Sequence, residues 1–174
     1  DENPVGSPPV YLSHIAGIYD DYLRQYVLDR RIEISPDALW QAGLAVSRKV
    51  YQLIIDRGYR LTMIGGGARG LHHFTELVGA SAVVTINWKG TADELIKSDP
   101  PVVSRLFNPV AQQVIDELVL KLPDFRRGWT ADGLKVDEYA EFGPVQLFRS
   151  SFVKSWSRVL DMTKERRVAL NREV

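Results

Sequence analysis

A glycine-rich loop with one arginine is the segment of this sequence best suited to bind an anion. The loop runs Gly65-Gly66-Gly67-Ala68-Arg69-Gly70, between an apolar run and a predicted helix. Consecutive glycines let backbone amides approach a ligand closely, and the start of a helix carries a partial positive charge. The Arg69 guanidinium adds a planar fork of donors that matches phosphate oxygens. The pattern predicts a phosphate site, with a flexible turn and an exposed arginine as the alternative.

The same glycines match the spacing G-x-G-x-x-G, which is typical of dinucleotide-binding proteins. That fingerprint requires an acidic residue at the end of the next strand to hold the ribose, but Asn87-Trp88-Lys89 stand there. The predicted helix after the loop is also short for this role. A nucleotide-binding α/β protein is therefore the weakest of the functions that the loop suggests.

Two further side chains have the chemistry for catalysis. Lys89 follows a predicted strand, where an amine removed from water could act as a nucleophile; the alternative is a solvated lysine that begins a loop with Gly90. His14 lies on the first predicted strand, where it could donate a proton or contact a phosphate. The alternative for His14 is a buried structural histidine, and both alternatives stay open.

Neighbouring histidines and aspartates give a less specific signal. His72 and His73 follow the glycine loop, where one of the pair is expected to face solvent, and neither has the partners that a metal site requires. Asp20 and Asp21 are adjacent rather than facing, so they are interpreted as charges at the start of a helix. No metal is expected from these residues.

Short apolar segments alternate with predicted helices through the first half of the chain. This alternation predicts parallel βαβ units with right-handed crossovers, so the predicted fold class is α/β. Strands are predicted over residues 10–17, 60–64 and 82–87, and helices from Tyr19, from Ser35 to Gly58, and over 71–78. The third strand is apolar enough to be covered on both faces.

The second half of the chain is predicted to be helical. Helices are expected over residues 91–97, 101–122 and 144–170, with a possible interruption at Pro109 and a polar connection over 123–141. Three strands are few for so many helices, and a parallel strand at a sheet edge exposes unpaired backbone groups. Further strands, from outside this sequence, are therefore expected.

Composition limits the classes of partner. The chain has 174 residues, of which 45% are hydrophobic, which predicts a single domain over residues 1–174. Lys plus Arg equal Asp plus Glu at 22 each, so no overall field favours nucleic acid or an anionic membrane. No apolar run approaches the roughly 20 residues that span a bilayer, and cysteine is absent. A cytoplasmic protein is the expectation.

Several segments, in the same order along the chain, resemble the transaldolase family. Residues 61–71 with 76–80 and 83–87 are similar to its seventh and eighth barrel strands, and residues 11–22 resemble its sixth strand with the acidic and aromatic residues after it. A tyrosine-rich helix that ends in Gly58-Tyr59 and a last helix with Lys154, Trp156, Leu160 and Lys164 complete the resemblance. It covers most of the chain, with low identity outside the glycine loop.

The resemblance implies a fold and an activity. Transaldolases are (β/α)8 barrels that transfer a dihydroxyacetone unit between sugar phosphates through a lysine Schiff base, without a metal or an organic cofactor. By this resemblance, residues 1–174 would be the C-terminal portion of a TIM barrel, with strands six to eight and the C-terminal helices. The family's catalytic lysine and acid-base residues lie on earlier strands, so a second chain or a missing N-terminal segment would complete the site.

The resemblance also implies phosphate-binding residues. Ser13 and Arg69 match the family's phosphate contacts, and Gly66 and Gly67 belong to the same loop. Ile18 stands where the family has a second arginine, and Gly67 stands where it has a serine. These departures motivate an alternative, a non-catalytic sugar-phosphate-binding or structural subunit derived from a transaldolase.

Overall fold

The structure, a computed structural model, describes residues 8–172, which fall into two units. The first unit covers residues 1–133 and holds the sheet with most of the helices; the second covers 134–174. Residues 1–7 and 173–174, which the predicted single domain includes, lie outside the described residues.

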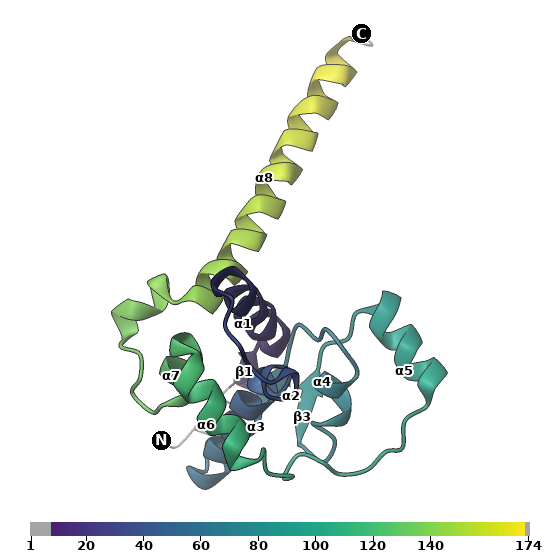
Figure 1. Ribbon diagram of the computed structural model, residues 1–174. Coiled ribbons are helices and arrows are strands. Elements are labelled where there is room, and N and C mark those ends of the chain that lie inside the picture. The colour runs from purple at the N-terminus through teal and green to yellow at the C-terminus, as the bar shows by residue number, and fades with distance from the viewer. Residues whose placement is uncertain (1–7, 173–174) are drawn as a thin grey trace. The chain divides into compact units, whose positions relative to one another are not determined.

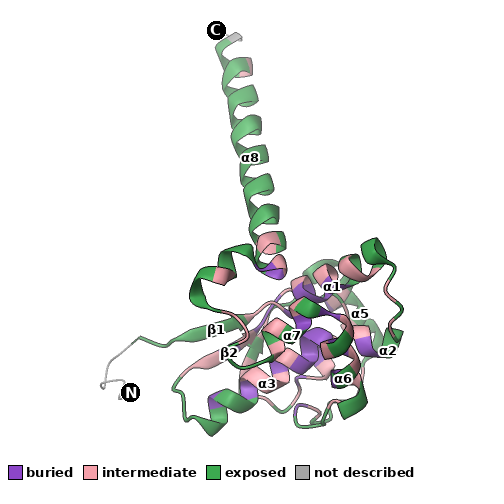
Figure 2. Cartoon of the chain, turned by 60° about the vertical axis from the view of Figure 1, so that its left-hand side comes forward, coloured by how far each residue is buried: buried purple, intermediate pink, exposed green. Residues whose placement is uncertain are grey.

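A three-stranded parallel sheet forms the centre of the first unit (Figures 1 and 2). Its strands are β1 (Tyr11–His14), β2 (Thr62–Gly65) and β3 (Ala82–Val84), which lie side by side in chain order. In this register Ser13 lies opposite Ile64, and Ile64 lies opposite Val83. The predicted α/β class with parallel strands separated by helices is confirmed, although each strand is shorter than predicted.

Helices make up most of the remaining chain. In the first unit they are α1 (Ala16–Arg30), α2 (Pro36–Leu39), α3 (Ala42–Asp56), α4 (His72–Thr75), α5 (Asp93–Ser98), α6 (Gln112–Lys121) and α7 (Pro123–Trp129), with a π-type segment η1 (Trp88–Ala92). The second unit holds a 3-10 helix η2 (Val136–Glu141) and α8 (Gly143–Arg172). The predicted starts of helices near Pro36 and in the last segment are confirmed.

Three predicted helices are wrong in extent: the one expected over 71–78 is reduced to α4, and distant hydrogen bonds explain the other two. The helix expected from Ser35 to Gly58 is divided into α2 and α3, because the Gly43 amide donates to the Asp20 carboxylate at 2.7 Å. Residues 101–111 are not helical: the Arg105 and Leu106 amides both donate to the carbonyl of Val78. Pro109, which has no amide hydrogen, follows them.

The expected connection over residues 123–141 also contains a helix. Pro123 occupies the first helical position of α7, where its missing N–H and fixed φ suit a helix start. Asp124 in the first turn adds a favourable charge at the positive end of the helix. These two start signals outweigh the polar composition of the segment.

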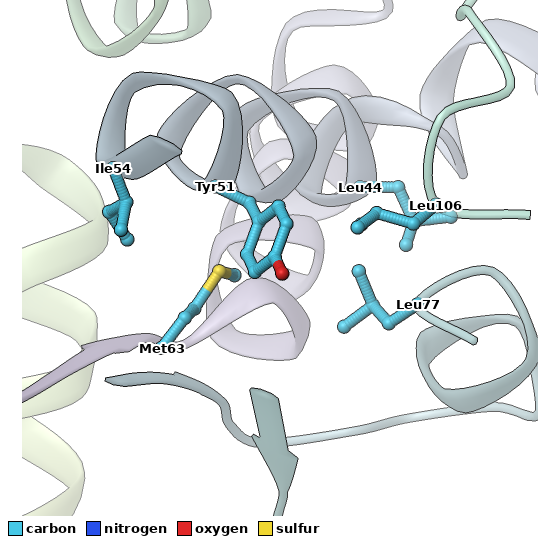
Figure 3. Close-up of a cluster of buried hydrophobic side chains, with 6 residues drawn as sticks. All are labelled: Leu44, Tyr51, Ile54, Met63, Leu77 and Leu106. Carbon is cyan, nitrogen blue, oxygen red and sulfur yellow. The ribbon is translucent and has the colours of Figure 1, made fainter. Parts of the chain in front are cut away.

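The main core lies between α3 and one face of the sheet (Figure 3). Met63 of β2 is 1% exposed and points toward α3. The other members of this core cluster are Leu44, Tyr51, Ile54, Leu77 and Leu106. Full burial of one such side chain contributes about 1.5–3 kcal/mol, so this face contributes much of the stability of the first unit.

The opposite face of the sheet is open in the residues that the structure describes. Side chains alternate along a strand, so Tyr11, Ser13, Ile64 and Val83 lie on the face away from Met63. Tyr11 is 55% and Val83 51% exposed, so β3 is not covered on both faces as expected. Within 8–172, β1 and β3 each pair only with β2. The expectation of further strands stays a prediction.

The second unit consists mainly of α8, a single helix of 30 residues (Figure 1). Large apolar side chains such as Phe152 and Trp156 are 61% and 64% exposed along it. Basic residues are interspersed with them. Of the helices described here, none combines the length and apolar character required to cross a membrane.

Candidate phosphate-binding site

The glycine loop leaves β2 beside the carboxyl end of β1. The Gly66 amide donates to the His14 carbonyl at 3.0 Å and extends the pairing of the two strands by one residue. The Ser13 Oγ atom lies 3.2 Å from the position that a Cβ on Gly66 would take. The structure therefore brings Ser13 and Gly66 together, as parallel strand ends do in barrel enzymes.

Close packing against α1 explains two of the glycines near the site. A Cβ on Gly17 would lie 1.7 Å from the carbonyl oxygen of Gly67, so this approach requires glycine at position 17. Gly67 itself has a φ of +65°, a conformation that favours glycine. The loop is therefore a shaped turn held against a helix, rather than a free segment.

Arg69 is already hydrogen-bonded at the loop. Its Nε atom lies 2.7 Å from the Asp21 carboxylate, and its Nη1 atom donates to the Gly67 carbonyl at 2.9 Å. The side chain remains 35% exposed, and its Nη2 atom donates to no residue within 8–172. An anion would find free donors here, but it would share the guanidinium charge with Asp21.

The backbone offers less help to an anion than the sequence suggested. Helix α4 has only four residues, so it cannot supply the positive end that the predicted helix over 71–78 implied. The Arg69 amide donates to Nδ1 of His73 at 3.2 Å, while the amide of the half-buried Gly67 has no acceptor in the described part of the chain. The Gly67 amide and Arg69 are therefore the donors that the loop itself leaves available.

Apolar side chains border the same loop. Ile15 has methyl carbons 2.8 and 2.7 Å from the Cβ positions of Gly66 and Gly67. Ile18 lies 3.9 Å from the Cβ position of Gly67. Ile18, which the sequence resemblance matches to a second arginine of transaldolases, is therefore close to the loop but supplies no charge.

His14 lies on the other side of the sheet from Ser13. Its Nδ1 atom is 2.7 Å from Ser47 Oγ, and Ser47 donates to the Gly43 carbonyl at 2.9 Å. Because the serine hydrogen is used in that bond, His14 donates from Nδ1. Burial, and to a smaller extent His73, lowers the pKa of His14 to about 4. Its contacts are those of a structural histidine, and its catalytic role stays a prediction.

Asp20 and His73 form a buried pair that no spacing in the sequence indicates. Asp20 Oδ2 lies 2.9 Å from His73 Nε2, and both residues are 3% exposed. His73 accepts at Nδ1 from the Arg69 amide, so its Nε2 carries the proton and donates to Asp20. Burial raises the pKa of Asp20 despite this bond. The interpretation of Asp20 and Asp21 as charges at the start of a helix is wrong, because α1 begins at Ala16 and its first turn contains no acidic residue.

The same pair, with His72, is the group among the described residues that comes nearest to a metal site. One ligand atom from each of Asp20, His72 and His73 lies within 4.8 Å of the others. A metal on His73 Nε2 would require the proton to move to Nδ1, where the Arg69 amide hydrogen already lies. The expectation that these histidines lack the partners of a metal site is therefore wrong in geometry, although the hydrogen bonds of His73 oppose metal binding. Burial lowers the pKa of His72 to about 4.

Lys89 lies apart from these groups along the chain, in η1 beyond β3. Lys89 is exposed, and its side chain forms no hydrogen bond or ion pair with residues 8–172. This is the environment of the solvated lysine that the sequence left as the alternative, and its role as a nucleophile remains a prediction.

Several hydrogen-bond donors lie near the carboxyl ends of β1 and β2. These donors are the Ser13 hydroxyl, the Gly67 amide and Arg69. The loop over residues 65–70 contains no lysine that could form a Schiff base. Comparisons of the chain with protein-family models, curated proteins and solved structures found no match.

Proposed function

We propose that this chain is the phosphate-binding end of a transaldolase-like (β/α)8 barrel, which a segment or chain outside this sequence completes with the Schiff-base lysine. The observation that carries the proposal is the position of Ser13 beside the Arg69 loop, at the carboxyl ends of neighbouring parallel strands. Phosphate sites of barrel enzymes lie at this end, near the last two strands. A sugar phosphate is the proposed ligand.

The arrangement of the sheet supports a barrel over other α/β folds. In a barrel, parallel strands follow one another in chain order and only the outer face carries helices. A doubly wound sheet reverses its strand order and has helices on both faces. The order β1-β2-β3, the open face around Val83 and the two unpaired edges among the described strands agree with the barrel. Five further strands would cover the open face and both edges.

In the proposed reaction this chain holds the substrate and the missing part supplies the amine. The lysine amine adds to the ketone of fructose 6-phosphate and water leaves, which gives an imine. The phosphate would accept hydrogen bonds from Ser13, the Gly67 amide and Arg69. No metal or organic cofactor takes part, and a cytoplasmic location is part of the proposal.

Reductive trapping tests the proposal. Borohydride reduces the imine to a secondary amine, so fructose 6-phosphate should label the completed assembly and leave this chain alone unlabelled, as measured by intact mass. The labelled residue should map to the added part. An adduct on Lys89 would instead place the nucleophile in this chain, and no adduct on the assembly would refute aldol transfer.

A non-catalytic sugar-phosphate-binding or structural subunit is the second candidate. The observations that favour it are the apolar Ile18 beside the loop and the partial neutralisation of Arg69 by Asp21. Such a subunit would bind fructose 6-phosphate without forming an adduct in any assembly. A titration with NAD and ATP tests the weaker alternative, a nucleotide-binding protein. The sequence disfavours that alternative, because Asn87 occupies the position where an acidic residue would bind the ribose.

A further inference from the structure

A cavity lies on the helix-covered side of the first unit, lined by residues other than those of the phosphate site. It has a volume of about 390 Å³ and lies between α3, the segment 106–112 and the end of α7. Ligand pockets of proteins commonly have volumes of about 300–1,000 Å³. The cavity is therefore large enough for a small organic molecule.

The charge in this cavity is positive. Its lining includes Arg48 and Lys49 but no aspartate or glutamate among the described residues. The Arg48 Nη2 atom lies 2.7 Å from the Glu76 carboxylate, which neutralises that guanidinium. Lys49 has no carboxylate partner among residues 8–172, and burial lowers its pKa. Lys49 is therefore the uncompensated cation of the cavity.

The Lys49 amine is held in place while part of its donor capacity stays free. Its Nζ atom donates to the Trp129 carbonyl at 2.5 Å and lies 4.0 Å from the centre of the Trp129 ring. An ammonium group has three donors, and one is used in this bond. The remaining donors can serve an anion in the cavity.

The lining of this cavity also contains an exposed aromatic ring and a side-chain amide without a hydrogen bond among the described residues. Phe107 lines the cavity and is 61% exposed, with its ring centre 6.3 Å from that of Tyr51. The Trp129 ring has contacts with Phe125 and with Lys49. The Asn108 side-chain amide also lines the cavity and makes no hydrogen bond with the described residues. The lining of the cavity thus combines an apolar ring surface with two groups that donate hydrogen bonds.

We infer that this cavity binds a flat carboxylate, an aromatic or conjugated acid, with its ring against Phe107 and its carboxylate on Lys49 and Asn108. One ammonium and one amide suit a monoanion better than a phosphate dianion, because each phosphate oxygen would require further donors. A planar ring suits Phe107 because offset stacking adds to the burial of apolar area. This inference does not depend on the proposed function.

Titration calorimetry of the full chain with 2-naphthoate tests the inference, with 2-naphthamide as the uncharged analogue. Saturable binding at one site is expected, with the amide at least about tenfold weaker because it lacks the charge that Lys49 pairs. Phe107→Ala and Lys49→Met should each weaken 2-naphthoate about tenfold or more, and Asn108→Ala about threefold to tenfold.

Matched controls separate this cavity from other surfaces. Phe152 is also 61% exposed, so Phe152→Ala should leave the affinity for 2-naphthoate unchanged. Arg69→Ala, at the phosphate site, should have no effect either. Because Lys49 also binds Trp129, circular dichroism is used to check that the Lys49→Met variant folds. If it does not fold, the affinities of the Phe107→Ala and Asn108→Ala variants for 2-naphthoate test the inference. The inference is overturned by absent saturation, by equal affinity for the amide, or by an unchanged Phe107→Ala variant.

Discussion

The two faces of the three-stranded sheet have different roles in this molecule. The face toward α3 contains Met63 and the His14 side chain, and it is packed, with His14 hydrogen-bonded to Ser47. The open face contains Ser13 and the exposed Val83, with the Arg69 loop at its edge. Residues adjacent in sequence, such as Ser13 and His14, therefore belong to different environments. Changes on the first face should affect stability, and changes around the second should affect binding.

The largest effect is expected at the buried pair. Asp20→Ala leaves the His73 Nε2 donor and the Gly43 amide without their acceptor, so the free energy of unfolding should fall by about 3–5 kcal/mol. Urea denaturation followed by circular dichroism measures it. The neighbouring Asp21→Ala is the control, because its exposed ion pair should change stability by less than about 1 kcal/mol. Equal losses of stability from Asp20→Ala and Asp21→Ala would contradict the view that the buried pair stabilises the fold more than the exposed ion pair does.

The apolar residues of the two faces offer a second test. Met63→Ala creates a cavity against α3 and should destabilise the chain by about 2–5 kcal/mol in the same urea experiment. Val83→Ala removes a side chain that is 51% exposed, so we expect less than about 1 kcal/mol. A large loss from Val83→Ala in the isolated chain would indicate that the open face is covered in solution.

His14 should make stability depend on pH. Its pKa is about 4 in the folded chain and about 6.5 when unfolded, so the unfolded state binds more protons between these values. The free energy of unfolding should therefore fall as pH decreases from 6.5 to 4, by at most about 3 kcal/mol from this residue. His14→Asn keeps a donor for Ser47 but cannot titrate, so the fall should be smaller in that variant. A parallel pH dependence in both proteins would exclude this contribution.

At the open face, binding should change more than stability. Arg69→Ala should weaken fructose 6-phosphate by about 1.5–3 kcal/mol through the loss of one charge-assisted contact, measured by titration calorimetry. Asp21→Asn should strengthen the same ligand, because the carboxylate that competes for Arg69 is neutralised. An unchanged affinity for fructose 6-phosphate in both variants would show that the glycine loop does not bind the phosphate.

The sequence predicted features whose cause is local. The apolar strands, the helix start at Pro36 and the long last helix follow from composition and spacing over a few residues. The resemblance to transaldolases implied that Ser13 belongs with the glycine loop, and the Ser13 Oγ atom lies 3.2 Å from the Cβ position of Gly66. The strands and helix starts do not depend on contacts with distant parts of the chain, whereas the position of Ser13 beside the loop depends on the pairing of β1 with β2.

Features with a distant cause were missed. The break between α2 and α3 depends on an aspartate 23 positions before the Gly43 amide, and the Asp20–His73 pair joins residues 53 positions apart. The non-helical segment before Pro109 depends on the carbonyl of Val78. No spacing in the sequence marks these partners, because each bond exists only after the sheet and helices have assembled.

The buried hydrogen bonds behind the glycine loop have a consequence for ligand binding. The Arg69 amide is bonded to His73, His73 to Asp20, and Asp20 to the first turn of α3. Fixing the backbone of one mobile residue takes about 1–2 kcal/mol of conformational entropy, and glycine loses more freedom than other residues. Here that ordering is completed when the chain folds. A ligand at the proposed site would meet a pre-organised loop, and its hydrogen bonds there would contribute to affinity with a smaller opposing loss of entropy.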